Sequence, residues 1–211
     1  MLAGFPFPYP DETIYSVLAR YQNKSGNVAV RKDYRDLFNE NRVFIATDLP
    51  SGLEPLFNKI NHYEGNISEH IIANHTPFIY FTNFLSVETR ELIKHQMLKF
   101  ESANKIHLLT GQVASPIKEE KYFRFCRECL NEDLSSYYET YWRVTNQLPG
   151  VYYCVIHKTM LSYSSVEYRQ RYTNLVHANN QNCQLNAKEN SQLLELNSNE
   201  KKLLLLIAEE S

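Results

Sequence analysis

Two pairs of metal-ligand residues constrain this chain more than any other feature. Cys126 and Cys129 are separated by two residues, and so are Cys154 and His157, with residues 130–153 between the pairs. A two-residue spacer lets one tight turn direct both side chains at a single point, and two such turns complete a tetrahedron. Thiolate and imidazole ligands suit zinc, and four protein ligands make a structural site. The spacing therefore predicts one structural Zn²⁺ ion.

Three other interpretations of these residues remain open. The cysteines could be buried thiols with His157 at the surface, or they could form a disulfide, which a reducing cytosol disfavours. A catalytic zinc would need an open position for water and a nearby base such as Glu128 or Glu139. The chain has no His-Glu-x-x-His sequence, and no Pro-Cys-x-x-Cys follows its His-x-Glu at residues 62–64. We therefore expect no enzymatic activity.

Composition limits the class of protein. The 211 residues are 43% hydrophobic and 22% charged, which is typical of a globular chain. A net charge of −2 argues against a protein that coats nucleic acid by charge alone, although it allows a local basic face. The first residues do not resemble a signal peptide, and no apolar run approaches the ~20 residues of a membrane span. We expect a cytoplasmic protein that does not bind membranes.

Residues 11–103 have apolar side chains at helical spacing. The first helix is predicted to begin with Asp11 as its N-cap and to end near residues 24–26. The second is predicted at residues 31–39, with basic side chains exposed. The other predicted elements are a short strand at residues 43–46 and helices that begin near residues 54, 66, 77 and 86, the last extending to residue 103. This part could include a helix-turn-helix, or it could be a helical bundle that binds protein.

The predicted fold is mainly α, with little β structure. We expect a compact helical domain at residues 1–115 and a small Cys3His zinc-binding domain at residues 116–180. Residues 181–211 are predicted to be a linker and the start of a further helical region. Its last helix has apolar side chains at residues 203–207, so either the chain continues in a longer protein or this helix packs on the zinc-binding domain.

The motifs around the zinc ligands resemble those of the TniQ/TnsD family, target-selection proteins of Tn-seven-type transposons. The similar segments, in family order, are residues 7–12, 15–16, 19–20, 74–78, 123–129, 137–143, 146–151 and 154–157, with Leu161 beyond the last. This chain differs from the family pattern at Tyr138, where glycine is usual, at Val144, where a second arginine is usual, and at Asn146, where histidine is usual. Arg127 and Val155 replace prolines. None of these differences changes a metal ligand.

The resemblance implies a protein that selects a transposition target without doing chemistry itself. Such a protein binds target DNA or a guide-RNA complex and recruits a AAA+ ATPase regulator, which in turn licenses the transposase. Basic residues beside the zinc ligands and on the second helix are candidate phosphate contacts: Lys121, Arg124, Arg127, Arg143, Arg31, Lys32 and Arg35. Tyr141 and Trp142 are expected in the core rather than as a base-stacking platform. The alternative function is a zinc-stabilised helix-turn-helix transcription regulator.

Overall fold

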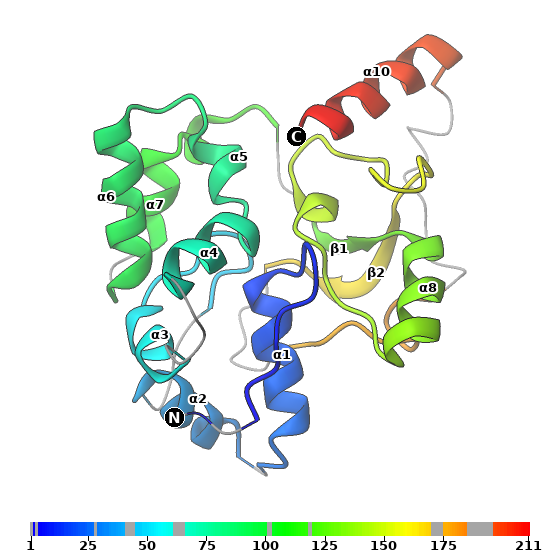
Figure 1. Ribbon diagram of the computed structural model, residues 1–211. Coiled ribbons are helices and arrows are strands. Elements are labelled where there is room, and N and C mark those ends of the chain that lie inside the picture. Colours follow the sequence, from blue (N-terminus) through cyan, green and yellow to red (C-terminus); the bar gives the residue numbers. More distant parts are fainter. Residues whose placement is uncertain are drawn as a thin grey trace. The chain divides into compact units, whose positions relative to one another are not determined.

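Helices make up most of the structure, a computed structural model in which residues 2, 4–27, 29–40, 45–60, 66–100, 103–117, 120–169, 175–184 and 196–211 are described (Figure 1). These residues form nine helices, two short strands and two 3-10 turns. The mainly α class is confirmed. The chain divides into two compact units: Met1–Pro116 with Gln170–Leu175, and Ile117–Arg169 with Val176–Ser211. Among the described helices, none is long and apolar enough to cross a membrane.

The first unit is built from short helices that bury one apolar face each. The elements are α1 (Ile14–Lys24), α2 (Val30–Phe38), α3 (Glu54–Ile60), α4 (Ile67–Asn74), α5 (Phe78–Thr82), α6 (Val87–Leu98), α7 (Ala103–Leu109) and the 3-10 turn η1 (Gln112–Ala114). Leu18, Leu37, Leu56 and Ile93 come from four different helices and are fully buried. Burial of such apolar faces, rather than helix propensity, stabilises helices this short.

Two predicted helix boundaries were wrong, and both have local causes. Thr13, not Asp11, caps α1, because its hydroxyl accepts the Ser16 N–H at 3.1 Å while Asp11 has a φ of 59°. The helix predicted at residues 86–103 ends at Leu98, since the backbone of Lys99 is extended and its carbonyl accepts the Gly52 N–H at 2.8 Å. The strand predicted at residues 43–46 lies partly outside the described residues, and the described residues 45 and 46 form no strand.

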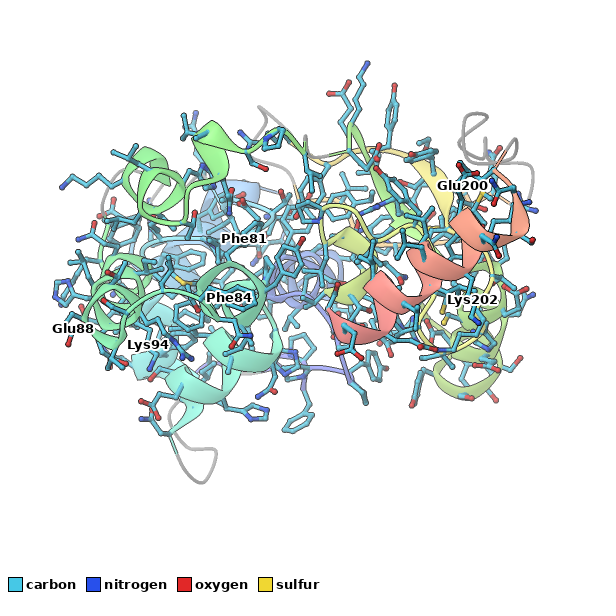
Figure 2. The ribbon with its side chains drawn as sticks, turned by 90° about the horizontal axis from the view of Figure 1, so that it is seen from above. Phe81, Phe84, Glu88, Lys94, Glu200 and Lys202 are labelled. Atoms are coloured by element: carbon cyan, nitrogen blue, oxygen red, sulfur yellow. The ribbon has the colours of Figure 1, made fainter. Side chains whose placement is uncertain are left out.

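The second unit has a two-stranded antiparallel sheet. Strand β1 (Tyr122–Phe125) pairs with β2 (Ser162–Glu167), with Arg124 opposite Tyr163 and Phe125 opposite Ser162. The other elements are α8 (Arg127–Tyr137), the 3-10 turn η2 (Thr145–Gln147) and α10 (Ser198–Glu210). Glu200 lies in the first turn of α10 (Figure 2) and forms a capping box with Asn197.

Trp142 forms the centre of this unit's core. It is fully buried and stacks on Phe123 with ring centroids 4.6 Å apart, and its Nε1–H donates to the Val176 carbonyl at 2.8 Å. Tyr168 packs edge-on against the other side of the same cluster, 5.0 Å from Phe123. Tyr141 is also buried, so both aromatic side chains lie in the core as predicted.

Candidate metal centre

The four predicted metal ligands come from two turns of the second unit. Cys126 follows β1 directly and is the N-cap residue of α8, so Cys129 lies in the first turn of that helix. Cys154 and His157 lie in a tight turn that the Lys158 N–H closes by donating to the Cys154 carbonyl at 2.9 Å. Lys158 has a φ of 58°, and this left-handed residue reverses the chain immediately after His157. Local backbone structure therefore directs both pairs.

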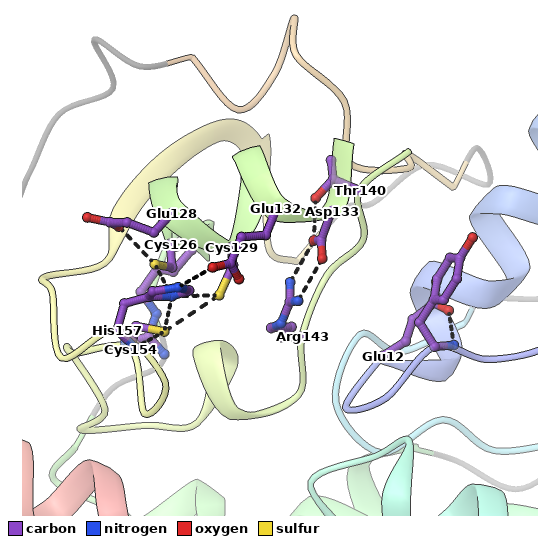
Figure 3. A network of polar contacts seen from close by, with 12 residues as sticks. Glu12, Cys126, Glu128, Cys129, Glu132, Asp133, Thr140, Arg143, Cys154 and His157 are labelled. Atoms are coloured by element: carbon purple, nitrogen blue, oxygen red, sulfur yellow. Dashed lines mark hydrogen bonds and ion pairs between the residues drawn. The ribbon is translucent and has the colours of Figure 1, made fainter. Parts of the chain in front are cut away.

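The ligand atoms have the spacing of a tetrahedral zinc site. The four atoms lie within 4.8 Å of one another. His157 Nδ1 is 3.5, 3.3 and 3.7 Å from the sulfurs of Cys126, Cys129 and Cys154, and the last two sulfurs are 3.7 Å apart (Figure 3). Tetrahedral zinc, with bonds of about 2.3 Å to sulfur and about 2.0 Å to nitrogen, requires separations of roughly 3.5–3.8 Å. All three cysteines are buried, so these residues fit a closed metal site.

A carboxylate orients the histidine ligand. His157 Nε2 lies 3.0 Å from the Glu132 carboxylate, which leaves Nδ1 facing the sulfurs. A carboxylate that accepts the second ring N–H of a histidine ligand fixes its tautomer and orientation. Glu132 was not predicted from the sequence, although it stands three residues after Cys129 and so shares its face of α8. Four converging protein ligands leave no open position, which opposes the catalytic interpretation.

The pKa values of two of the three thiols are shifted in opposite directions. Hydrogen bonds from Cys126 and Cys129 lower the pKa of Cys154 to about 3, and hydrogen bonds with Cys126 and Cys154 raise the pKa of Cys129. The thiolate is the form of cysteine that binds metal. The fourth cysteine, Cys183, is buried elsewhere in this unit, and burial raises its pKa to about 12. Among the described residues, Cys183 does not belong to the group that could hold a metal ion.

Arg124, one of the predicted phosphate contacts, is buried among protein partners. The side chain is 2% exposed, and its guanidinium donates to the carbonyls of Val151 and Leu148, the latter at 2.9 Å. Gln147 accepts the Arg124 backbone N–H and donates to its carbonyl, each at 2.9 Å. Arg124 therefore holds the 147–151 segment against β1.

The segment that Arg124 holds is a tight turn. The Val151 N–H donates to the Leu148 carbonyl at 3.1 Å, and Gly150 has a φ of 81°. Proline at the second position and a glycine with positive φ at the third are the requirements of a type II turn. Pro149 and Gly150 therefore determine the conformation of this turn, and the hydrogen bonds of Arg124 and Gln147 hold the turn against β1.

Arg143, another predicted phosphate contact, is also buried. It is 8% exposed, and its two terminal nitrogens donate to both oxygens of Asp133, each at 2.8 Å (Figure 3). Thr140 donates to the same carboxylate at 3.0 Å. Burial lowers the pKa of Arg143, but the hydrogen bond and charge of Asp133 outweigh it and raise the pKa above the ordinary value. This bidentate pair joins α8 to the segment after it, and Asp133 was not predicted from the sequence.

The other five candidate phosphate contacts lie at or near the surface. Arg31, Lys32 and Arg35 are exposed on α2. Lys121 is exposed, with its Nζ 3.8 Å from the Glu167 carboxylate and 5.2 Å from the centroid of the Tyr122 ring. Arg127 is half-buried in the first turn of α8. The structure therefore leaves two separate groups of cations, one in each unit.

Comparison with known proteins gives the family. The TniQ family model matches residues 3–161, which include all four ligands of the metal centre. The chain is 28% identical over 161 residues to the Escherichia coli protein named "Transposon Tn7 transposition protein TnsD". That alignment covers 76% of this chain and 31% of the relative, so the chain spans about a third of the relative's length. Because the family model matches well over half of the sequence, the chain belongs to the TniQ family.

Proposed function

We propose that this chain is a target-selection adaptor for transposition. It engages target DNA, or a guide-RNA complex bound there, and recruits the AAA+ ATPase regulator that licenses the transposase. The observation that carries this proposal is the family match over residues 3–161, together with the similarity to a transposition protein. In this role the chain positions other proteins and does no chemistry itself.

The metal in this proposal is a structural zinc ion. Three sulfurs and one imidazole nitrogen are the donors of a Cys3His zinc site, and a hard cation would prefer oxygen ligands. Bound zinc would join α8 to the turn at residues 154–157, because each supplies one pair of ligands. In this role the ion fixes the relative positions of the segments that the second unit presents to its partners.

The alternative, a helix-turn-helix transcription regulator, has less support. Helix α6 has 12 residues and follows α5 after four residues, which is a suitable turn length. A recognition helix contacts DNA with its N-terminal residues. In α6 that end presents the exposed side chain of Glu88 (Figure 2) and that of Glu91, and both carboxylates would approach the negatively charged DNA. This acidic end opposes major-groove binding.

Recruitment is tested by co-purifying the tagged chain with the AAA+ ATPase of its own transposon, with and without target DNA. We expect a retained complex and one zinc ion per chain by mass spectrometry. Cys126→Ser should lose both, whereas Cys183→Ser, a matched change of a buried cysteine outside the centre, should keep both. Failure of the wild-type chain to retain the ATPase under either condition would refute the adaptor role.

A further inference from the structure

Helix α10 contacts the rest of the second unit through one of its faces. Ala208 on that face is 2% exposed, and its neighbours Leu204 and Leu205 are half-buried. Near the end of the helix, Lys158 Nζ lies 2.7 Å from the Glu209 carboxylate, which ties α10 to the turn that carries two of the metal ligands. The apolar side chains of α10 are therefore divided between a packed face and a second face.

The second face of α10 is apolar and exposed. Leu203, Leu206 and Ile207 stand at i, i+3 and i+4, so they line one side of the helix. They are 59%, 47% and 41% exposed. Adjacent large apolar side chains at helical spacing form the stripe through which one helix packs on another.

The charges of α10 run against its own dipole. Lys202 (Figure 2) lies in the first half of the helix, whereas Glu209 and Glu210 lie in its last turn. Cations near the N-terminus of a helix and carboxylates near its C-terminus are electrostatically unfavourable. Glu200, near the N-terminus, is used in the capping box. Lys202 and Glu210 are both exposed, and neither has an ion-pair partner among the described residues.

These charges become complementary beside a second α10 that runs antiparallel. Lys202, Leu206 and Glu210 form one i, i+4 row, so the two charges lie about 6 Å along the axis on either side of the leucine. A two-fold axis at Leu206 would bring Lys202 of each copy level with Glu210 of the other and set the two apolar stripes face to face. A parallel pair would place like charges side by side.

We propose that α10 is an interface between two copies of this chain, paired antiparallel through Leu203, Leu206 and Ile207 and flanked by two Lys202–Glu210 ion pairs. The stripe is much smaller than a standard protein interface, so the dimer is weak and forms reversibly with concentration. It goes beyond the proposed function and does not depend on it, because the partner is defined by the chemistry of α10 itself.

The test is sedimentation equilibrium of the whole 211-residue chain over protein concentrations from about 1 to 200 µM. The average mass of the wild type should rise towards that of a dimer. Leu203→Gln/Leu206→Gln/Ile207→Gln should raise the dissociation constant at least about tenfold. Circular dichroism and zinc content should remain those of the wild type, because the three changed side chains are exposed.

A matched control changes three exposed apolar residues of the first unit. Ile79→Gln/Phe84→Gln/Val87→Gln should leave the dissociation constant unchanged. A wild-type chain that stays monomeric at every concentration would overturn the proposal in favour of another occupant for this face. Equal weakening by the two triple variants, or a dimer that survives the α10 changes, would also overturn it.

A charge exchange tests the antiparallel arrangement. Lys202→Glu and Glu210→Lys each place like charges opposite one another, twice in a two-fold pair, and should each weaken the dimer roughly tenfold at low salt. The double variant Lys202→Glu/Glu210→Lys should recover the wild-type dissociation constant, and the differences should shrink at 1 M salt. Failure of the double variant to recover would overturn the antiparallel pairing.

Discussion

The two units of this chain are stabilised in different ways. In the first unit, helices with buried leucine and isoleucine side chains pack together, as in most small helical domains. In the second, the described residues form a sheet of two strands, of four and six residues. A two-stranded sheet of this length is marginal alone in water. The buried hydrogen bonds of two arginines connect distant segments of this unit, and a metal ion bound by the four ligand residues would connect others.

The arginines show what this difference means for function. Arg124 and Arg143 stand beside the metal centre, yet each is buried with carbonyl or carboxylate partners. Arg31 and Arg35 stand far from it in sequence and are exposed. Proximity to a candidate metal site therefore does not by itself make a basic residue a recognition residue, because this unit also uses buried charge to hold its own segments together.

Metal removal should have the largest effect, and this effect should be confined to the second unit. Zinc contributes roughly 10–16 kcal/mol to small finger peptides at neutral pH, and a larger unit depends on it less. Chelation or Cys126→Ser should abolish hydrogen-exchange protection across residues 120–165 while the helices of the first unit keep theirs. Cys183→Ser is the control. Unchanged protection across residues 120–165 in the Cys126 variant would contradict this comparison.

The buried ion pair should show the next largest effect. Asp133→Ala leaves the Arg143 guanidinium buried without its partner, and such a change costs about 3–5 kcal/mol. The double variant Asp133→Leu/Arg143→Met should recover most of the loss, because no charge then remains buried. Lys99 and Glu54, whose nitrogen and oxygen lie 2.7 Å apart in the first unit, form an exposed pair. Its removal should cost less than about 1 kcal/mol.

Denaturant unfolding of all four proteins provides the measurement. Similar losses for the buried and the exposed pair would show that the Asp133–Arg143 hydrogen bonds contribute no more than a surface contact does. In that case the second unit would depend on its metal and apolar core alone.

Much of the architecture was predictable because it depends on local signals. The spacing of Cys126, Cys129, Cys154 and His157 defines a ligand set without any knowledge of the fold. Helical periodicity located α2 to within one residue at each end. Such features require only neighbours along the chain.

The unpredicted features depend on contacts distant in sequence. Whether Arg124 faces solvent or the 147–151 turn depends on the pairing of β1 with β2, which periodicity does not specify for strands of four and six residues. The end of α6 depends on the loop at residues 52–53, whose backbone N–H groups bond to the carbonyls of Lys99 and Met97. Tertiary hydrogen bonds overrode the local signal in both cases.

A buried charged contact between Glu12 and Arg20 should give the first unit a distinctive pH dependence. Glu12 is fully buried and accepts hydrogen bonds from Arg20 Nη1 at 2.7 Å and the Tyr9 N–H at 3.0 Å. Burial raises its pKa from 4.5 to about 7, although Arg20 opposes the shift. Between these two pH values the unfolded chain loses the proton first, so the free energy of unfolding falls as pH rises.

The variant Glu12→Gln should remove this fall, whose slope is at most about 1.4 kcal/mol per pH unit. Burial lowers the pKa of His75 below its unfolded value of 6.5. The titration of His75 therefore makes the free energy of unfolding rise, not fall, as pH rises toward 6.5. The difference between variant and wild type isolates Glu12 from it. Glu69→Gln, an exposed change in the same unit, is the control. Identical pH profiles for all three proteins would mean that Glu12 titrates alike in the folded and unfolded chains.

The smallest predicted effect is a gain of stability in the second unit at Tyr138. This residue ends α8 with a φ of 60° and is 90% exposed, so its side chain packs against little. A left-handed conformation costs a non-glycine residue about 1–2 kcal/mol. Glycine avoids this strain, but its greater conformational freedom in the unfolded chain offsets part of the gain. Tyr138→Gly should therefore raise the free energy of unfolding by up to about 1 kcal/mol.

The first unit provides the matched control for this change. Asn39 ends α2 with a φ of 61°, and asparagine tolerates that conformation better than tyrosine, so Asn39→Gly should have a smaller effect. Thermal unfolding followed by circular dichroism measures both variants. Destabilisation by Tyr138→Gly would show that the tyrosine ring contributes a contact that exceeds its backbone strain. The exposed Tyr138 side chain would then stabilise the second unit despite the strain in its backbone.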